Sequence, residues 1–146
     1  MIAYIDTSAL LRILLKQPNA LQEWSQIDRF VSSVLIGVES LRAVDRIRLR
    51  GGLSDIEIAR LRRAILAMIA EIELVEIDAL ILDRAAQPMP TELGSLDAIH
   101  LTSALLWQQS ANEEVHFATH DRALAVAAVA YGMKVLGVCL RFNDVH

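Results

Sequence analysis

The sequence predicts a three-layer α/β/α fold built on a central, mostly parallel sheet of about five short strands. Short apolar runs alternate with longer helical patterns, which is the order expected of a parallel sheet covered by helices. The runs are continuously apolar, as is typical of strands buried on both faces. Composition agrees: 54% of the 146 residues are hydrophobic and 22% charged, the balance of a folded protein. Because no repeat or linker-like stretch interrupts the pattern, we expect a single domain over 1–146.

The first predicted strand is the apolar run from Ile2 to Ile5. It stops at Asp6, and we expect Thr7 or Ser8 to cap a helix that begins at Ala9. Asp6 therefore lies where a buried strand ends and a helix begins. In open parallel sheets, ligands bind at this carboxyl edge. A turn or cap role is the simpler interpretation of Asp6 taken alone.

The remaining elements follow from apolar periodicity, caps and breakers. Ser54 and Glu57 form a capping box, Gly51 and Gly52 end one helix, and the prolines near 88–90 exclude another. The pattern predicts, in chain order, a helix over 20–26, a strand over 30–36, a helix over 37–50, a helix from 55 to about 72, a strand over 74–77, a helix after Asp78 through 86, a helix from about 97 to 108, a strand over 115–118, a helix over 121–131 and a strand over 135–138.

Three further acidic residues share the situation of Asp6. Asp121 follows the strand over 115–118 and precedes a helix, where capping is an equally simple role. Asp97 lies in an apolar helix start where Ser95 is available as the cap. Glu39 lies in another apolar helix start, and the helix dipole favours an acid there by only about 0.3–1 kcal/mol.

Right-handed crossovers would bring these four acids to one edge of the sheet. Two carboxylates about 5 Å apart repel by roughly 3 kcal/mol at an effective dielectric of about 20, so six bare pairs would cost on the order of 20 kcal/mol. Such a cluster must hold cations or protons. Oxygen ligands without Cys or paired His favour Mg²⁺ or Mn²⁺ over zinc.

Four motifs resemble the PIN-domain family: D-T-S-A-L-L from Asp6, V-E-S-L-R around Glu39, L-G-S-L-D-A-I-H-L-T-S-A-L around Asp97, and T-H-D ending at Asp121. The resemblance runs from Met1 to about Val138 and is greatest to the VapC-type toxins of bacterial toxin–antitoxin pairs. It implies strand order 3-2-1-4-5, with Asp6 and Asp121 neighbours. It also implies a metal-dependent endoribonuclease that uses one or two Mg²⁺ or Mn²⁺ ions, a cognate antitoxin partner and a homodimer.

The resemblance places the metal-binding and catalytic positions on Asp6, Glu39, Asp97 and Asp121. Thr7, Ser8 and Thr119 are the nearest hydroxyls, expected to hold carboxylates or phosphate if they do not simply cap helices. His100, three residues after Asp97, is expected to make a structural hydrogen bond and not to bind metal. We assign no role to His120.

A basic stripe leads away from Glu39 along the predicted helix: Arg42, Arg46 and Arg50 follow at spacings of three, four and four. The net charge is −4, so any nucleic-acid surface must be local, and seven of the 14 Lys and Arg residues fall between Arg42 and Arg63. The stripe suits RNA phosphates or an antitoxin. Arg42 pairing with Glu39, or a solvated helix face, are the alternatives.

Two other functions remain open from the sequence. A PIN-like module that binds RNA or protein without cleavage would not need all four acids. A haloacid dehalogenase-type phosphohydrolase would need Asp two residues after Asp6, where Ser8 stands. The longest apolar runs are too short to span a membrane, no signal peptide is visible, and Cys139 is the single cysteine, so a cytoplasmic protein is expected.

Overall fold

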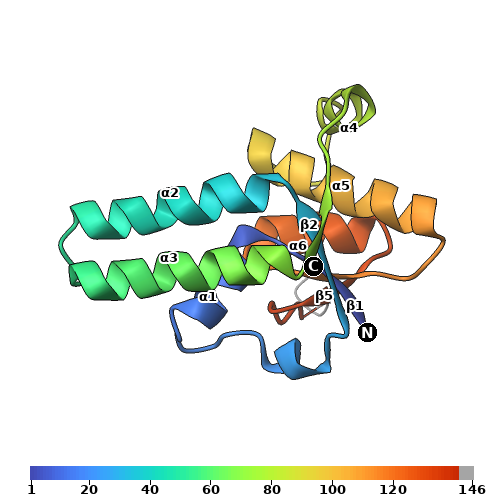
Figure 1. Ribbon diagram of the computed structural model, residues 1–146. Coiled ribbons are helices and arrows are strands. Elements are labelled where there is room, and N and C mark those ends of the chain that lie inside the picture. The colour runs from blue at the N-terminus through green and yellow to red at the C-terminus, as the bar shows by residue number, and fades with distance from the viewer. Residues whose placement is uncertain (142–146) are drawn as a thin grey trace.

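The computed structural model describes residues 1–141 (Figure 1). Along this part of the chain the elements are β1 (Ile2–Ile5), α1 (Thr7–Leu14), the 3₁₀ turn η1 (Gln22–Gln26), β2 (Arg29–Ser33), α2 (Leu35–Leu49), α3 (Asp55–Ala70), β3 (Ile72–Val75), α4 (Ala79–Ala85), α5 (Ser95–Ala111), β4 (His116–Ala118), α6 (Arg122–Ala130) and β5 (Lys134–Leu136).

The five strands form one sheet in the order β3-β2-β1-β4-β5, and every pairing is parallel. The predicted sheet and its order are therefore confirmed. β1 lies at the centre, where Tyr4 pairs in register with Val31 of β2 and Phe117 of β4. Ala3, Tyr4 and Ile5 have no solvent-exposed surface, which explains the unbroken apolar run.

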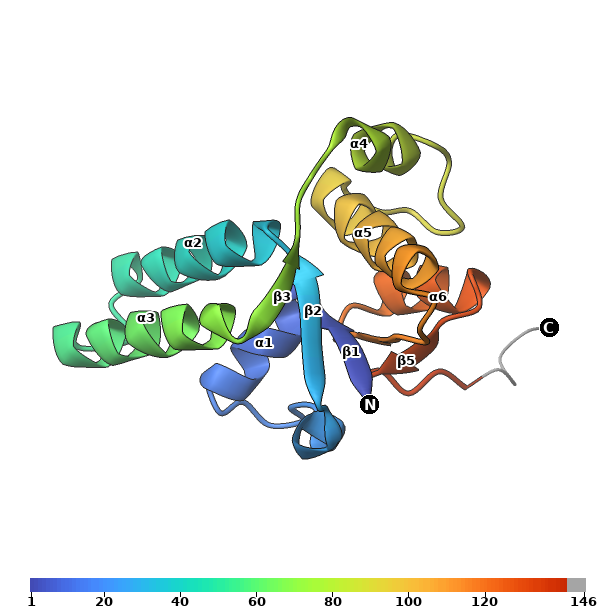
Figure 2. The same cartoon turned by 45° about the vertical axis from the view of Figure 1, so that its right-hand side comes forward.

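Helices cover both faces of the sheet (Figure 2). On one face, α5 and α6 pack over Tyr4, Val31 and Phe117. On the other, α1 packs over Ala3 and Ile5, together with the sheet-proximal ends of α2 and α3. The three-layer prediction holds.

α2 and α3 form an antiparallel pair that extends away from the sheet (Figure 1). A small apolar core around Val44, Ile58, Leu61 and Ile65 holds the two helices together. The Ser54–Glu57 capping box is present at the start of α3, as predicted. Gly51 takes a φ of 73° at the turn between the helices, a conformation that favours glycine.

Several boundaries differ from the predictions. Asp6 itself, not Thr7 or Ser8, caps α1, because its backbone is extended and its carboxylate accepts from the Ala9 N–H. The 20–26 helix is only a 3₁₀ turn, and Gly94, without a side-chain bond, takes the cap position expected for Ser95. α2 begins at Leu35, two residues before Gly37, and β3 begins at Ile72. None of the helices within residues 1–141 is long and apolar enough to cross a membrane.

Candidate active site

Four acidic side chains belong to elements that start at the carboxyl edge of the sheet. Asp6 follows β1 and Asp121 follows shortly after β4, the two adjacent strands where the sheet order reverses direction. Glu39 lies in the second turn of α2, which follows β2, and Asp97 lies in the first turn of α5. A topological switch point of this kind is the usual ligand site of open α/β sheets.

Asp6 is the most deeply buried of the four, with 4% of its surface exposed. Its Oδ1 accepts hydrogen bonds from Ser8 Oγ at 2.7 Å and from the Ala9 N–H at 2.9 Å, and its Oδ2 accepts from Thr119 Oγ1. Burial raises the pKa of the Asp6 carboxyl, and the three hydrogen bonds oppose that rise. Asp6 is therefore both the cap of α1 and a carboxylate held in one orientation.

Thr119 links Asp6 to Asp121. Its hydroxyl donates to Asp6 and accepts from the Asp121 N–H at 3.0 Å. Ser8 adds a second connection, because its Oγ accepts from the His120 N–H at 3.0 Å. The Asp121 carboxylate, on an exposed residue, caps α6 by accepting from the Leu124 N–H at 2.8 Å. The α1 and α6 starts are thus tied together by two hydroxyls that the sequence singled out.

Glu39 is held through a single oxygen. Thr7 Oγ1 donates to Glu39 Oε1 over 3.2 Å, and His100 Nε2 lies 2.5 Å from the same oxygen. The other ring nitrogen, His100 Nδ1, is 2.7 Å from the Tyr4 hydroxyl, which accepts from the Ser33 N–H at 2.9 Å. The expected structural hydrogen bonding of His100 is present, since the residue is 1% exposed and bonded through both nitrogens.

Tyr4 belongs to the hydrogen-bonded cluster behind Glu39, and the sequence motifs did not indicate this. Burial raises the pKa of its phenol well above the ordinary value, so the hydroxyl keeps its proton. A sequence signal existed: a buried tyrosine needs a hydrogen-bond partner, and Tyr4 is the polar-tipped residue in an otherwise apolar strand.

Asp97 differs from the other acids because no hydrogen bond within residues 1–141 ends on its carboxylate. Burial raises its pKa first, and the charges of Asp121, Asp6 and Glu39 raise it further, against a lowering by His100. The other three carboxylates therefore lie close enough for their charges to raise the pKa of Asp97.

The four acidic side chains are not arranged to coordinate one ion. Within residues 1–141, no three His, Cys, Asp or Glu side chains are grouped closely enough to hold one ion. Asp6, Glu39 and Asp121 each turn instead toward protein hydrogen-bond donors. The four acids nevertheless offer only carboxylate oxygens, the chemistry that a hard cation prefers, and no hydrogen bond within residues 1–141 occupies the carboxylate of Asp97.

The residues of the basic stripe belong to α2 and its C-cap, Arg50, and α2 extends away from the sheet (Figure 1). Arg42 pairs with Asp45 over 3.3 Å, so the alternative in which it pairs with Glu39 is wrong. Asp45 also pairs with Arg48, and the two arginines lower its pKa. Arg46 and Arg50 are exposed and join none of the ion pairs within residues 1–141.

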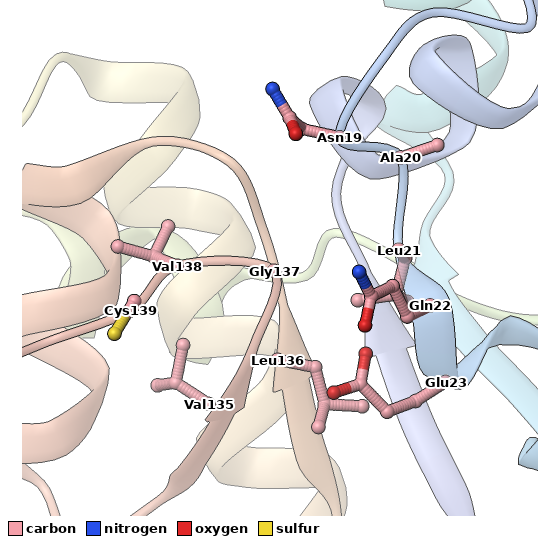
Figure 3. Close-up of a pocket in the computed structure, with 10 residues that line it drawn as sticks. All are labelled: Asn19, Ala20, Leu21, Gln22, Glu23, Val135, Leu136, Gly137, Val138 and Cys139. Carbon is pink, nitrogen blue, oxygen red and sulfur yellow. The ribbon is translucent and has the colours of Figure 1, made fainter.

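A separate cleft of about 320 Å³ lies between the 19–23 segment and residues 135–139, where β5 ends (Figure 3). None of the four acids lines it. Its relation to the acidic site is through Gly137, whose backbone approaches Thr119 so closely that a Cβ would overlap the Thr119 carbonyl oxygen. The carbonyl of Gly137 also lies 2.9 Å from His120 Nδ1.

Comparison with known proteins agrees with this architecture. The PIN domain family matches residues 3–136. Ribonuclease VapC46 of Mycobacterium tuberculosis is 33% identical over 138 residues, covering 91% of this chain and 95% of that protein. Ribonuclease VapC35 of the same species is 30% identical, covering 91% and 94%. The crystal structure of PAE2754 from Pyrobaculum aerophilum superposes with a TM-score of 0.56 at 18% identity, covering 92% of this chain and 89% of that one. The chain belongs to the PIN-domain family, and within it to the VapC proteins.

Proposed function

We propose that the protein is a divalent-metal-dependent endoribonuclease, the toxin of a toxin–antitoxin pair, and that residues 1–146 form its single domain. Two relatives bear the name ribonuclease VapC and align over nearly the whole chain. The observation that carries the proposal is Asp97: a carboxyl without a hydrogen-bond donor whose pKa is raised by burial and by three other carboxylates. Such a group gains most from a cation.

Asp6 and Asp97 are the principal metal ligands in this proposal, with Glu39 and Asp121 completing the coordination or orienting the attacking water. One or two Mg²⁺ or Mn²⁺ ions would supply a water of lowered pKa and neutralise charge on the scissile phosphate. Thr119 and Ser8 hold the Asp6 carboxylate in place, and Thr7 does so for Glu39. Because Asp6 is almost fully buried, its negative charge is weakly screened and acts strongly on a bound cation.

Arg42, Arg46 and Arg50 would contact the RNA backbone or the antitoxin. Phosphate neutralisation by arginine supplies affinity that is independent of sequence, which suits a surface leading away from the hydrolytic site. The cognate antitoxin and a homodimer remain part of the proposal. A small open reading frame directly beside the gene would support the antitoxin; an isolated gene would remove that part and leave the nuclease.

Three N-cap aspartates provide a matched test. Asp6, Asp78 and Asp121 each accept a backbone N–H of the third helical residue, and asparagine caps helices as well as aspartate does. We expect Asp6→Asn and Asp121→Asn to lower Mn²⁺-dependent cleavage of a panel of structured RNAs by at least 100-fold, and Asp78→Asn on α4 to leave it unchanged. Chelator should abolish wild-type cleavage.

Two outcomes would contradict the proposal. Cleavage that survives Asp6→Asn would place the reaction elsewhere. If the wild type binds these RNAs but cleaves none of them with either metal, the protein is a binding module without nuclease activity.

A further inference from the structure

The hydrogen-bond chain behind Glu39 has a direction that the donors and acceptors fix. The Tyr4 hydroxyl accepts from the Ser33 N–H and lies 2.7 Å from His100 Nδ1. A carboxylate oxygen can only accept, so His100 Nε2, 2.5 Å from Glu39 Oε1, carries a proton. In the neutral imidazole Nδ1 is then an acceptor, and the Tyr4 hydroxyl donates to it.

This direction determines which oxygen of Glu39 is free. Nε2–H of His100 and the Thr7 hydroxyl both donate to Oε1. Within residues 1–141 no hydrogen bond ends on Oε2. The carboxylate, on a side chain that is 21% exposed, is therefore clamped at its inner oxygen and open at its outer one.

The clamp is rigid because its parts are in the core. Tyr4 belongs to the central strand, stacks on Phe117 with ring centroids 5.3 Å apart, and is fully buried, while His100 is 1% exposed. This hydrogen-bond chain therefore links Tyr4 of β1, through His100 of α5, to Glu39 of α2.

We propose that Tyr4 and His100 are positioning residues that hold Glu39 Oε1 and present Oε2 to the cation. This inference rests on the proposed function, since it assigns Glu39 a share in metal binding. Outer hydrogen bonds of this kind typically change metal affinity or activity by 10–100-fold when removed.

Two substitutions of His100 separate its hydrogen bond to Tyr4 from its hydrogen bond to Glu39. In His100→Gln, the amide nitrogen reaches the place of Nε2 and can still donate to Glu39. In His100→Asn, the amide oxygen reaches the place of Nδ1 and keeps the Tyr4 bond, but the donor to Glu39 is lost. We expect His100→Asn to weaken Mn²⁺ binding, measured by calorimetry without RNA, by about tenfold or more. His100→Gln should stay within about threefold of wild type.

Ser40→Ala is the control for a change in the buried surroundings of Glu39. The Ser40 hydroxyl is fully buried, adjacent in sequence, and without a hydrogen-bond partner within residues 1–141. Its loss should leave Mn²⁺ affinity and melting temperature unchanged. Equal losses of affinity in both His100 variants, in proportion to their losses of melting temperature, would mean that His100 is only structural and would overturn the proposal.

A second readout needs neither RNA nor metal. Two-bond ¹H–¹⁵N correlation spectra of the wild type should show His100 with its proton on Nε2 and an unprotonated Nδ1. A proton on Nδ1 would contradict the direction of the hydrogen-bond chain and overturn the proposal. If the wild type binds Mn²⁺ but cleaves no RNA, the proposed nuclease function fails while the calorimetry and the spectra still decide this proposal.

Discussion

Replacing Asp97 by asparagine removes a carboxylate that accepts no hydrogen bond within residues 1–141 and is repelled by three other carboxylates. The substitution keeps the size of the side chain and its place in the first turn of α5. Without metal, it should therefore stabilise the protein. With metal, it should remove a principal ligand.

The size of the effect follows from Coulomb's law. One carboxylate pair at roughly 8 Å and an effective dielectric of about 20 costs about 2 kcal/mol, and salt at about 0.15 M reduces this to under half. The three partners are Asp121, Asp6 and Glu39, and Asp97 is only partly buried. We expect a gain of about 1–2 kcal/mol in the free energy of unfolding in chelator, which is a rise of about 3–6 °C in melting temperature.

The gain should depend on pH. The pKa of Asp97 is raised in the folded protein, so the stability linked to its protonated form is complete below the unfolded value of about 3.9 and is lost as pH rises through the folded value. The difference between Asp97→Asn and wild type should therefore be greatest at neutral pH and vanish near pH 4. The stability linked to the protonated form of Asp6 is also lost as pH rises, because burial raises the pKa of Asp6 as well.

Thermal unfolding followed by circular dichroism, with chelator and with Mn²⁺ from pH 4 to pH 8, checks this expectation. Mn²⁺ should raise the melting temperature of the wild type, increasingly with pH because ligands must be deprotonated. It should have little effect on Asp97→Asn. A variant that is less stable than wild type in chelator at pH 7, or equally stabilised by Mn²⁺, would refute the reasoning.

Further expectations concern the surroundings of the site. Gly137→Ala should lower the free energy of unfolding by about 3 kcal/mol or more, because φ is +94° and the new Cβ would overlap the Thr119 carbonyl. Urea unfolding measures this loss, and a value under about 1 kcal/mol would contradict the contact. Ser54→Ala should cost about 1 kcal/mol through the lost cap of α3, with an unchanged Mn²⁺ response in the same thermal scans. Arg46→Glu combined with Arg50→Glu should weaken RNA binding and reduce the slope of log K against log salt by about 1.4. Arg84→Glu on α4 should change neither the affinity nor the slope. Equal slopes for the double variant and the wild type, in titrations from about 50 to 200 mM salt, would assign the stripe to another partner.

Most of the fold follows from short-range patterns in the sequence. The apolar run of β1, the Ser54–Glu57 capping box and the Asp78 and Asp121 caps each predicted the element that is present. Boundaries were less predictable where two neighbouring residues compete for one role. Asp6, Thr7 and Ser8 can all cap a helix, and only the extended backbone at Asp6 decides between them.

The position of the four acids at one edge of the sheet was predictable, but their hydrogen-bond partners were not. That four acids share one edge follows from strand ends and crossover handedness. The partners of each acid depend on contacts across long sequence separations: Thr119 with Asp6, and Tyr4 with His100. The coordination geometry also depends on whether a cation or a hydrogen-bond donor compensates each carboxylate, which no sequence pattern records.

The most direct test of the account is anomalous diffraction from crystals grown with Mn²⁺. We expect an ion bonded to carboxylate oxygens of Asp6 and Asp97, with Glu39 or Asp121 turned toward it directly or through water. A protein crystallised at saturating Mn²⁺ with no anomalous peak between these carboxylates, or with its ion bound elsewhere, would contradict it.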